Sequence, residues 1–378
     1  MTNNTSEAIW EKLQKGVFVI AEAGKNFIQT EDDRSVAEYL ANAKRLVDEA
    51  VKGGADAIKF QTHTVEDEVM DIDFTSPHFT AKGSSRYQWV TRNTKATPLD
   101  EFWKPLKSYC DEKGIIFMST PMSRGAAQKL DQVGMNVWKV GSGDILDFVC
   151  MDYIRDSEKP IILSSGMSTL EEVKKAVDFL REKNRRVALL HCVSKYPCPP
   201  EELRLGTITF FKETFDIPIG FSDHSIGIEP DLVAVAMGAT IIEKHFSLSR
   251  DFYGADHKVS MTPDELASLI AGIKEVLENP EKKKEILESE YAKKAMSKRE
   301  KILQEDEAVF RPLFHKSLVF GRSLSKDTML TKDMVYAMRP QAYIKGLPSE
   351  DYERVIGKTV TRNVVAYEPV TEDIINVS

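Results

Sequence analysis

Long apolar runs and an apolar leader are both missing from this sequence. No stretch approaches the roughly 20 apolar residues that a membrane-spanning helix needs. Residues 1–16, MTNNTSEAIWEKLQKG, are polar and contain no apolar signal core. We therefore expect a protein without a membrane partner.

Cysteine is also scarce, and the chain carries no net positive charge. The four cysteines (Cys110, Cys150, Cys192 and Cys198) form no CxxC pair, which is typical of a reduced, cytoplasmic protein. The formal net charge of −8 makes a broad basic surface for nucleic acid implausible. Any lysines with a functional role must then act locally, on a small anion.

Eight short apolar runs are present, separated by segments with helical periodicity. Each run is continuously apolar, as expected for a parallel strand covered on both faces. The pattern predicts an α/β fold, a (β/α)8 TIM barrel. An open doubly wound sheet is the competitor, but the first turn, AEAGKN, lacks the GxGxxG pattern. The runs are residues 17–24, 57–62, 115–120, 137–142, 160–166, 187–193, 218–224 and 240–246.

The character of the chain changes after the last run. We expect a TIM-barrel catalytic domain over 1–280, a charged, solvated helical linker over 281–312 and a small β-rich domain over 313–378. Within the last of these, residues 321–335 and 361–375 resemble each other, which indicates internal pseudo-symmetry. Residues 71–98, between the second and third runs, are predicted to be a long loop near the active site.

Polar side chains gather where the apolar runs end, and these ends build the active site of a barrel. Lysines with several hydroxyls and the turn GSGD suit a cradle for phosphate or carboxylate. His224 and His245 end adjacent runs, and two neutral imidazoles can hold a divalent metal if water and substrate oxygens complete the shell. A charge inside an apolar run is costly unless it is paired, so these residues are expected to act together.

Nine motifs in order carry a family resemblance: VFVIAEAG, GGADAIKFQTHTVEDE, FMSTPMS, WKVGSGDI, ILSSGMST, LLHCVSKYPCPP, GFSDHSIG, IIEKHF and GADHKVSMTP. They resemble the sialic acid (N-acetylneuraminate) synthase family, and the tail resembles its antifreeze-like (SAF) domain. The resemblance implies condensation of phosphoenolpyruvate with an N-acyl amino sugar and release of phosphate. It also implies a divalent metal, Mn²⁺ or Mg²⁺, and a domain-swapped homodimer whose tail covers the partner's barrel.

The same resemblance implies roles for individual residues. His224 and His245 would bind the metal. Glu22, Asp144 and His245 would be catalytic, and whether Glu22 or Asp144 moves protons stays open. Arg339 would reach the N-acyl group of the sugar. The residues implied for phosphoenolpyruvate are Lys59, Thr120, Lys139, Ser142, Ser164, Ser194 and Ser222, and those around the sugar are Gln61, Tyr196 and Asp256.

Two departures from the family pattern bear on this assignment. Asp144 stands where many members have Glu, and RPQAYIKGLP replaces a Gly-rich loop after Arg339. The sugar is left open between N-acetylmannosamine and a 6-deoxy diacetamido sugar. One alternative is a synthase for phosphorylated sugars, for which Arg86 and Arg92 offer the extra basic residues. The other is a non-catalytic carbohydrate-binding protein, which would have lost cradle or metal residues, and none is missing.

Overall fold

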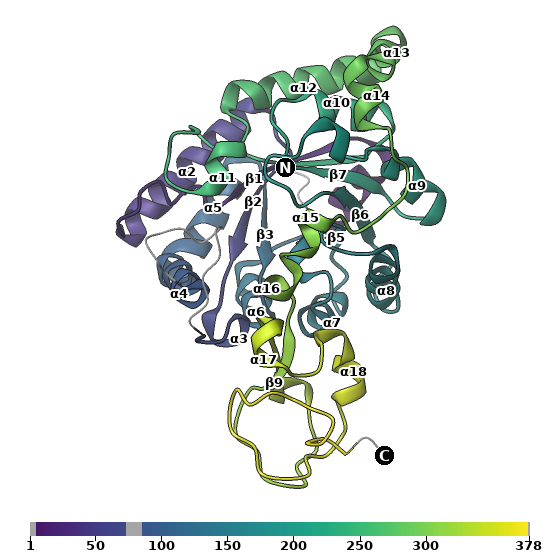
Figure 1. The fold of residues 1–378 in the computed structure, drawn as a ribbon. Helices are drawn as coiled ribbons and strands as arrows, with labels where there is room; N and C mark the ends of the chain where they lie inside the picture. Colours follow the sequence, from purple (N-terminus) through teal and green to yellow (C-terminus); the bar gives the residue numbers. More distant parts are fainter. Residues whose placement is uncertain (1–4, 73–84, 377–378) are drawn as a thin grey trace.

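Eight parallel strands curl into a near-closed barrel in the computed structural model, which describes residues 5–72 and 85–376. Their order is β3-β2-β1-β8-β7-β6-β5-β4, and β3 and β4 at its two ends contact each other. Figure 1 shows the strands at the centre, with helices around them. All eight apolar runs form these strands, which confirms the predicted TIM barrel. The strands are β1 (Phe18–Gly24), β2 (Ala57–Thr62), β3 (Ile116–Pro121), β4 (Trp138–Val140), β5 (Ile161–Ser164), β6 (Val187–Cys192), β7 (Ile219–Asp223) and β8 (Ile241–His245).

Amphipathic helices surround the strands and begin at capping residues that the sequence displays. Capping boxes at Ser35, Thr169 and Thr262 start α2, α8 and α12, each with a Glu three residues later that returns the hydrogen bond. The outer helices are α2 (Val36–Gly53), α5 (Lys104–Lys113), α6 (Arg124–Val133), α7 (Phe148–Arg155), α8 (Leu170–Arg181), α9 (Gly206–Thr214), α10 (Glu229–Ala236) and α12 (Pro263–Glu278). None of the helices within the described ranges is long and apolar enough to cross a membrane.

The N-terminal end of the barrel is closed by helix α1 (Ser6–Lys15). Ile9 and Leu13 on this helix are buried against Phe18, Met118 and other side chains of the barrel interior. This apolar plug leaves the C-terminal ends of the strands as the open face, where the barrel architecture places a site.

The long loop predicted over 71–98 is wrong in part, because residues 86–96 form helix α4 (Arg86–Ala96). Ser85 and Gln88 make a capping box that starts it, and the π-helical turn η1 (Leu99–Trp103) follows. Residues 73–84 of the predicted loop lie outside the described residues. Two further short helices, α3 (Val65–Glu68) and α11 (Ala255–Val259), follow the ends of β2 and β8.

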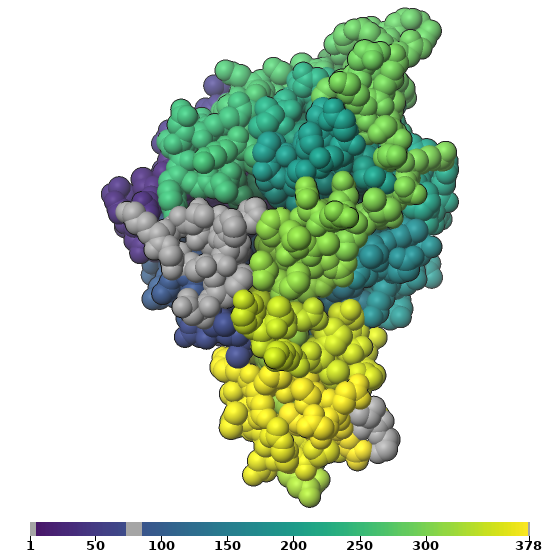
Figure 2. Space-filling model, in the orientation of Figure 1, coloured from purple at the N-terminus to yellow at the C-terminus, as the bar shows by residue number. Residues whose placement is uncertain are grey.

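The charged segment after the barrel is helical at first, as α13 (Pro280–Glu288) and α14 (Glu290–Ala295), but it does not stay in solvent. It continues across the barrel through α15 (Glu305–Ala308) and α16 (Arg311–Phe314), as the yellow-green segment in Figure 2 shows. Lys301 and Glu307 are 7% and 1% exposed. The expectation of a solvated linker over 281–312 is therefore wrong at Lys301 and Glu307, and Asp306 and Arg311 form ion pairs with Lys195 and Glu172 of the barrel.

The tail is a small unit built on the antiparallel pair β9 (Ser317–Phe320) and β10 (Val335–Met338). Its other elements are η4 (Lys332–Met334), α17 (Gln341–Ile344), η5 (Ser349–Asp351) and α18 (Tyr352–Val355). Leu324 and Val364, equivalent positions of the internal repeat, exchange two backbone hydrogen bonds of 3.0 Å each. The tail lies against α6 and α7 of the same chain (Figures 1 and 2).

Candidate active site

A cavity of about 750 Å³ opens at the C-terminal ends of the strands. Every residue to which the sequence assigned a role lines it. The structure therefore brings the predicted site residues together, while their individual roles stay predictions. These residues are Glu22, Lys59, Gln61, Thr120, Lys139, Ser142, Asp144, Ser164, Ser194, Tyr196, Ser222, His224, His245, Asp256 and Arg339.

Two buried lysines from β2 and β4 form the centre of the cavity. Lys59 Nζ lies 2.7 Å from Glu22 Oε2 and donates to Thr120 Oγ1 at 3.1 Å. Lys139 Nζ donates to Ser164 Oγ at 2.6 Å. Both ammonium groups approach Glu243 Oε1, at 3.6 and 3.7 Å. Two cations with hydroxyls beside them form a preorganised cradle for a small anion.

The pKa values of the two lysines shift in opposite directions, although burial acts to lower both. Burial lowers the pKa of Lys139. The same burial acts on Lys59, but the charges of Glu22 and Glu243 outweigh it and raise that pKa. Glu243 was not among the residues predicted for the site, although a carboxylate inside an apolar run was a visible signal.

Hydroxyl groups after β4 and β6 meet around Gly166, which follows β5. Ser142 Oγ accepts a hydrogen bond from the Gly166 N–H at 3.1 Å. A Cβ at Gly166 would stand 2.6 Å from Ser142 Oγ and closer still to Ser194 Oγ, so only glycine fits between them. Glu307 supports the same loops: its Oε1 accepts from the N–H of Met167 at 2.8 Å and of Ser194 at 2.9 Å.

His224 and His245 lie side by side, with ring centroids 5.5 Å apart. His224 Nδ1 donates to the Val193 carbonyl at 2.8 Å, so Nε2, 2.9 Å from the Tyr196 hydroxyl, is the nitrogen left for a ligand. Burial would lower the pKa of His224, but Cys192 outweighs it and raises that pKa. His245 Nδ1 is buried without a hydrogen-bond partner among the described residues. Burial lowers the pKa of His245 to about 4, so its imidazole is neutral at pH 7.

The two imidazoles, once both are neutral, fit a divalent metal. Within residues 5–72 and 85–376, no group of three or more His, Cys, Asp or Glu side chains is placed to hold such an ion. Water or substrate oxygens would have to supply its remaining ligands.

The charged residues that precede the two histidines pair with each other. Asp223 and Lys244 are partners in the β7–β8 register, and their side chains form a buried ion pair. Lys244 Nζ also donates to the Ser225 carbonyl at 2.9 Å, and the Ser225 N–H donates to Asp223 at 2.9 Å. The pair therefore fixes the backbone on both sides of His224 and ties it to the strand that carries His245.

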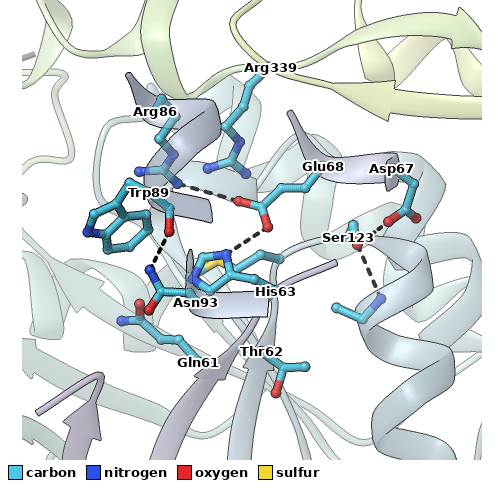
Figure 3. A network of polar contacts seen from close by, with 12 residues as sticks. Gln61, Thr62, His63, Asp67, Glu68, Arg86, Trp89, Asn93, Ser123 and Arg339 are labelled. Atoms are coloured by element: carbon cyan, nitrogen blue, oxygen red, sulfur yellow. Dashed lines mark hydrogen bonds and ion pairs between the residues drawn. The ribbon is translucent and has the colours of Figure 1, made fainter. Parts of the chain in front are cut away.

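A second polar network joins the barrel to the tail (Figure 3). Glu68 lies 2.7 Å from His63 Nδ1 and 3.5 Å from Arg86, and its backbone carbonyl accepts from the Arg339 N–H at 3.0 Å. Burial would raise the pKa of Glu68, but His63, Arg339 and Arg86 outweigh burial and hold it at about 2. The ionised Glu68 side chain thus contacts His63 after β2 and Arg86 of α4, while its backbone contacts Arg339 of the tail.

Arg339 enters the cavity of its own barrel, where it forms an ion pair with Asp144. Lys316 at the start of the tail lies 3.0 Å from Asp144 and 2.6 Å from Asp147. This differs from the expectation that Arg339 reaches a second subunit. The physical reason is that residues 301–316 follow the surface of their own barrel and anchor the tail beside it. A homodimer stays a prediction.

Several residues that line the cavity were not predicted from the sequence. Lys25 follows β1, Trp89 and Asn93 come from α4, and Phe310 and Phe314 come from the segment after the barrel. The capping box at Ser85 could have revealed α4 and thus Trp89 and Asn93. The phenylalanines lie in a segment whose charged composition resembles a solvated surface.

The fold and the cavity define a TIM-barrel enzyme with an anion cradle at the C-terminal ends of its strands. The NeuB family profile matches residues 46–285, and the chain belongs to the NeuB family. It is therefore an enzyme of the NeuB type.

Relatives cover nearly the whole chain. The N,N'-diacetyllegionaminic acid synthase of Campylobacter jejuni is 31% identical over 95% of this chain and 100% of its own length. The human N-acetylneuraminate-9-phosphate synthase is 29% identical over 97% of this chain and 95% of its own. The crystal structure of the Bacillus subtilis spore coat polysaccharide biosynthesis protein SpsE superposes with a TM-score of 0.73 at 29% identity, covering 96% of both chains.

Proposed function

We propose that this enzyme condenses phosphoenolpyruvate with an N-acylated amino sugar to form a nonulosonic acid and inorganic phosphate. The observation that carries the proposal is the pair of buried ammonium groups, Lys59 and Lys139, within hydrogen-bond distance of Thr120 and Ser164. Such a cradle suits the phosphate and carboxylate of phosphoenolpyruvate. The names of the relatives, which are synthases of legionaminic and neuraminic acid types, support the reaction class.

The reaction forms one C–C bond and breaks one C–O bond. C3 of phosphoenolpyruvate attacks the aldehyde carbon of the open-chain sugar, and water adds at C2. The tetrahedral intermediate then expels phosphate. A divalent ion, Mn²⁺ or Mg²⁺, when bound by His224 and His245, would polarise the aldehyde. The lysines and hydroxyls position phosphoenolpyruvate and stabilise the negative charge on the leaving phosphate.

Glu22 fits proton transfer better than Asp144. Asp144 is engaged by two cations of the tail, Arg339 and Lys316. Glu22 faces the cavity beside Lys59, and burial raises its pKa, which is the direction that suits a carboxyl group acting in proton transfer. Arg339 offers a forked donor for the acyl oxygen of the sugar.

The proposal is tested by incubating the purified protein with phosphoenolpyruvate, Mn²⁺ and a panel of N-acyl amino sugars while recording phosphate release. The panel contains N-acetylmannosamine, its 6-phosphate and 6-deoxy diacetamido sugars. We expect sugar-dependent release, lost in Lys139→Met. Release that never exceeds the sugar-free control with any of these sugars would contradict the proposal.

A further inference from the structure

Lys25 is a cation inside the cavity without a carboxylate partner. It follows β1 in a turn that begins at Gly24 (φ +51°) and is fixed by the Asn26 side chain, which donates to the Phe246 carbonyl at 2.8 Å. Its Nζ donates to Gln61 Oε1 at 2.6 Å and lies 4.2 Å from the centre of the Trp89 ring. Among the described residues, no Asp or Glu oxygen lies within 4.0 Å of this nitrogen.

The charges around Lys25 do not replace such a partner. Asp256, Glu22 and Glu68 act on it from a distance, and Arg86 opposes them. Burial has the largest effect and lowers the pKa of Lys25 to about 8. The Gln61 amide oxygen accepts a hydrogen bond from the ammonium group, and the Trp89 ring covers one side of it. Neither group carries a negative charge, so the charge of Lys25 stays uncompensated.

The position of Lys25 separates it from the phosphoenolpyruvate cradle. Gln61 receives the hydrogen bond of Lys25 and donates its own to Glu22 Oε1 at 3.0 Å, and Glu22 in turn pairs with Lys59. Lys25 and Lys59 therefore lie at opposite ends of this chain of contacts. The ammonium group of Lys25 is a second positive charge, next to Gln61, which is one of the residues implied for the sugar. Trp89 and Arg86, which line the cavity next to it, both come from helix α4.

We propose that Lys25 binds a negatively charged oxyanion group on the sugar substrate, either a phosphate ester or a carboxylate. This inference rests on the proposed function, and it narrows the sugar to one that carries an anionic substituent. A neutral N-acyl amino sugar would bury the Lys25 ammonium without a counter-charge. An anionic one would supply the missing partner through a charge-assisted hydrogen bond.

The test compares kcat/KM for N-acetylmannosamine, its 6-phosphate and N-acetylmannosaminuronic acid, each with phosphoenolpyruvate and Mn²⁺. We expect at least a tenfold preference for one of the two charged sugars, and the preferred one identifies the oxyanion. Lys25→Met should lower kcat/KM for that sugar roughly ten- to hundredfold, the range for a lost charge-assisted hydrogen bond, and lower kcat/KM for the neutral sugar less. Lys25→Arg should retain most of the preference.

Lys44→Met is the matched control, because Lys44 Nζ also lies over an aromatic ring, that of Tyr109 at 4.8 Å, but outside the cavity. Lys44→Met should change kcat/KM for neither the charged nor the neutral sugar. Equal kcat/KM for neutral and charged sugars, or an equal loss for both in Lys25→Met, would overturn the inference.

A separate binding measurement distinguishes this inference from the proposed function. If no sugar releases phosphate, the proposed function fails, and calorimetry of the 6-phosphate and the uronic acid without phosphoenolpyruvate decides the role of Lys25. Binding that Lys25→Met abolishes upholds the oxyanion subsite. Binding that is absent, or unchanged in Lys25→Met, overturns it.

Discussion

Adding a single methyl group at Gly166 should weaken phosphoenolpyruvate binding. The new Cβ of Gly166→Ala would stand 2.6 Å from Ser142 Oγ, closer still to Ser194 Oγ and 3.0 Å from Cys192 Sγ. Overpacking of this kind costs roughly 1–3 kcal/mol. Since both hydroxyls belong to the proposed cradle, we expect much of that cost to fall on phosphoenolpyruvate. At about 1.36 kcal/mol per tenfold change, KM for phosphoenolpyruvate should rise roughly 5- to 150-fold.

The assay is steady-state phosphate release with each substrate varied in turn, together with thermal denaturation. KM for the sugar should change much less than KM for phosphoenolpyruvate. Gly16→Ala is the control, because its Cβ would come no closer than 3.7 Å to any atom outside its chain neighbours and it lies far from the cavity. An unchanged KM for phosphoenolpyruvate with a lowered Tm would refute the reasoning, because Gly166 would then serve packing alone.

Three further predictions concern the metal site, the segment after the barrel and the junction with the tail. His245→Ala should abolish Mn²⁺ binding followed by electron paramagnetic resonance while leaving the fold intact, and undiminished activity of this variant after chelation would contradict the metal site. Glu307→Ala should lower Tm, since it leaves two buried N–H groups without an acceptor, at a cost of roughly 1–3 kcal/mol each. Glu305 is exposed, so Glu305→Ala should leave Tm unchanged, and equal Tm values for the two variants would contradict the prediction. Because the pKa of Glu68 is held at about 2, below its ordinary 4.5, its stabilisation is full above pH 4.5 and is lost as pH falls towards 2. The difference in unfolding free energy between wild type and Glu68→Gln should therefore shrink over that range, and a constant difference would count against the network.

The barrel could be predicted because continuous apolar runs identify buried parallel strands without any tertiary information. The residues at their ends followed from the same reasoning, since parallel strands of a barrel deliver their C-terminal ends to one face. Lys59, Lys139 and the two histidines were found in this way. All four line one cavity because the strands run parallel and α1 closes the other end of the barrel.

The rest depends on pairings that a linear sequence does not display. Asp223 and Lys244 looked like isolated charges before two histidines, yet they form one buried ion pair across neighbouring strands. Glu307 lies in a segment that resembles a solvated linker, but its partners are backbone N–H groups, which carry no sequence signal. Arg339 was assigned to the cavity, while the path of its tail beside its own barrel depends on contacts of Lys316 that composition does not reveal.

The fate of the bridging oxygen of phosphoenolpyruvate tests the central claim most directly. The protein is incubated with Mn²⁺, an N-acyl amino sugar from the panel and phosphoenolpyruvate labelled with ¹⁸O between C2 and phosphorus, and both products are analysed by mass spectrometry. C–O cleavage predicts that phosphate and nonulosonic acid form in equal amounts and that the label leaves entirely with phosphate. Label retained in the carbon product, or labelled phosphate released without the sugar, would contradict the account.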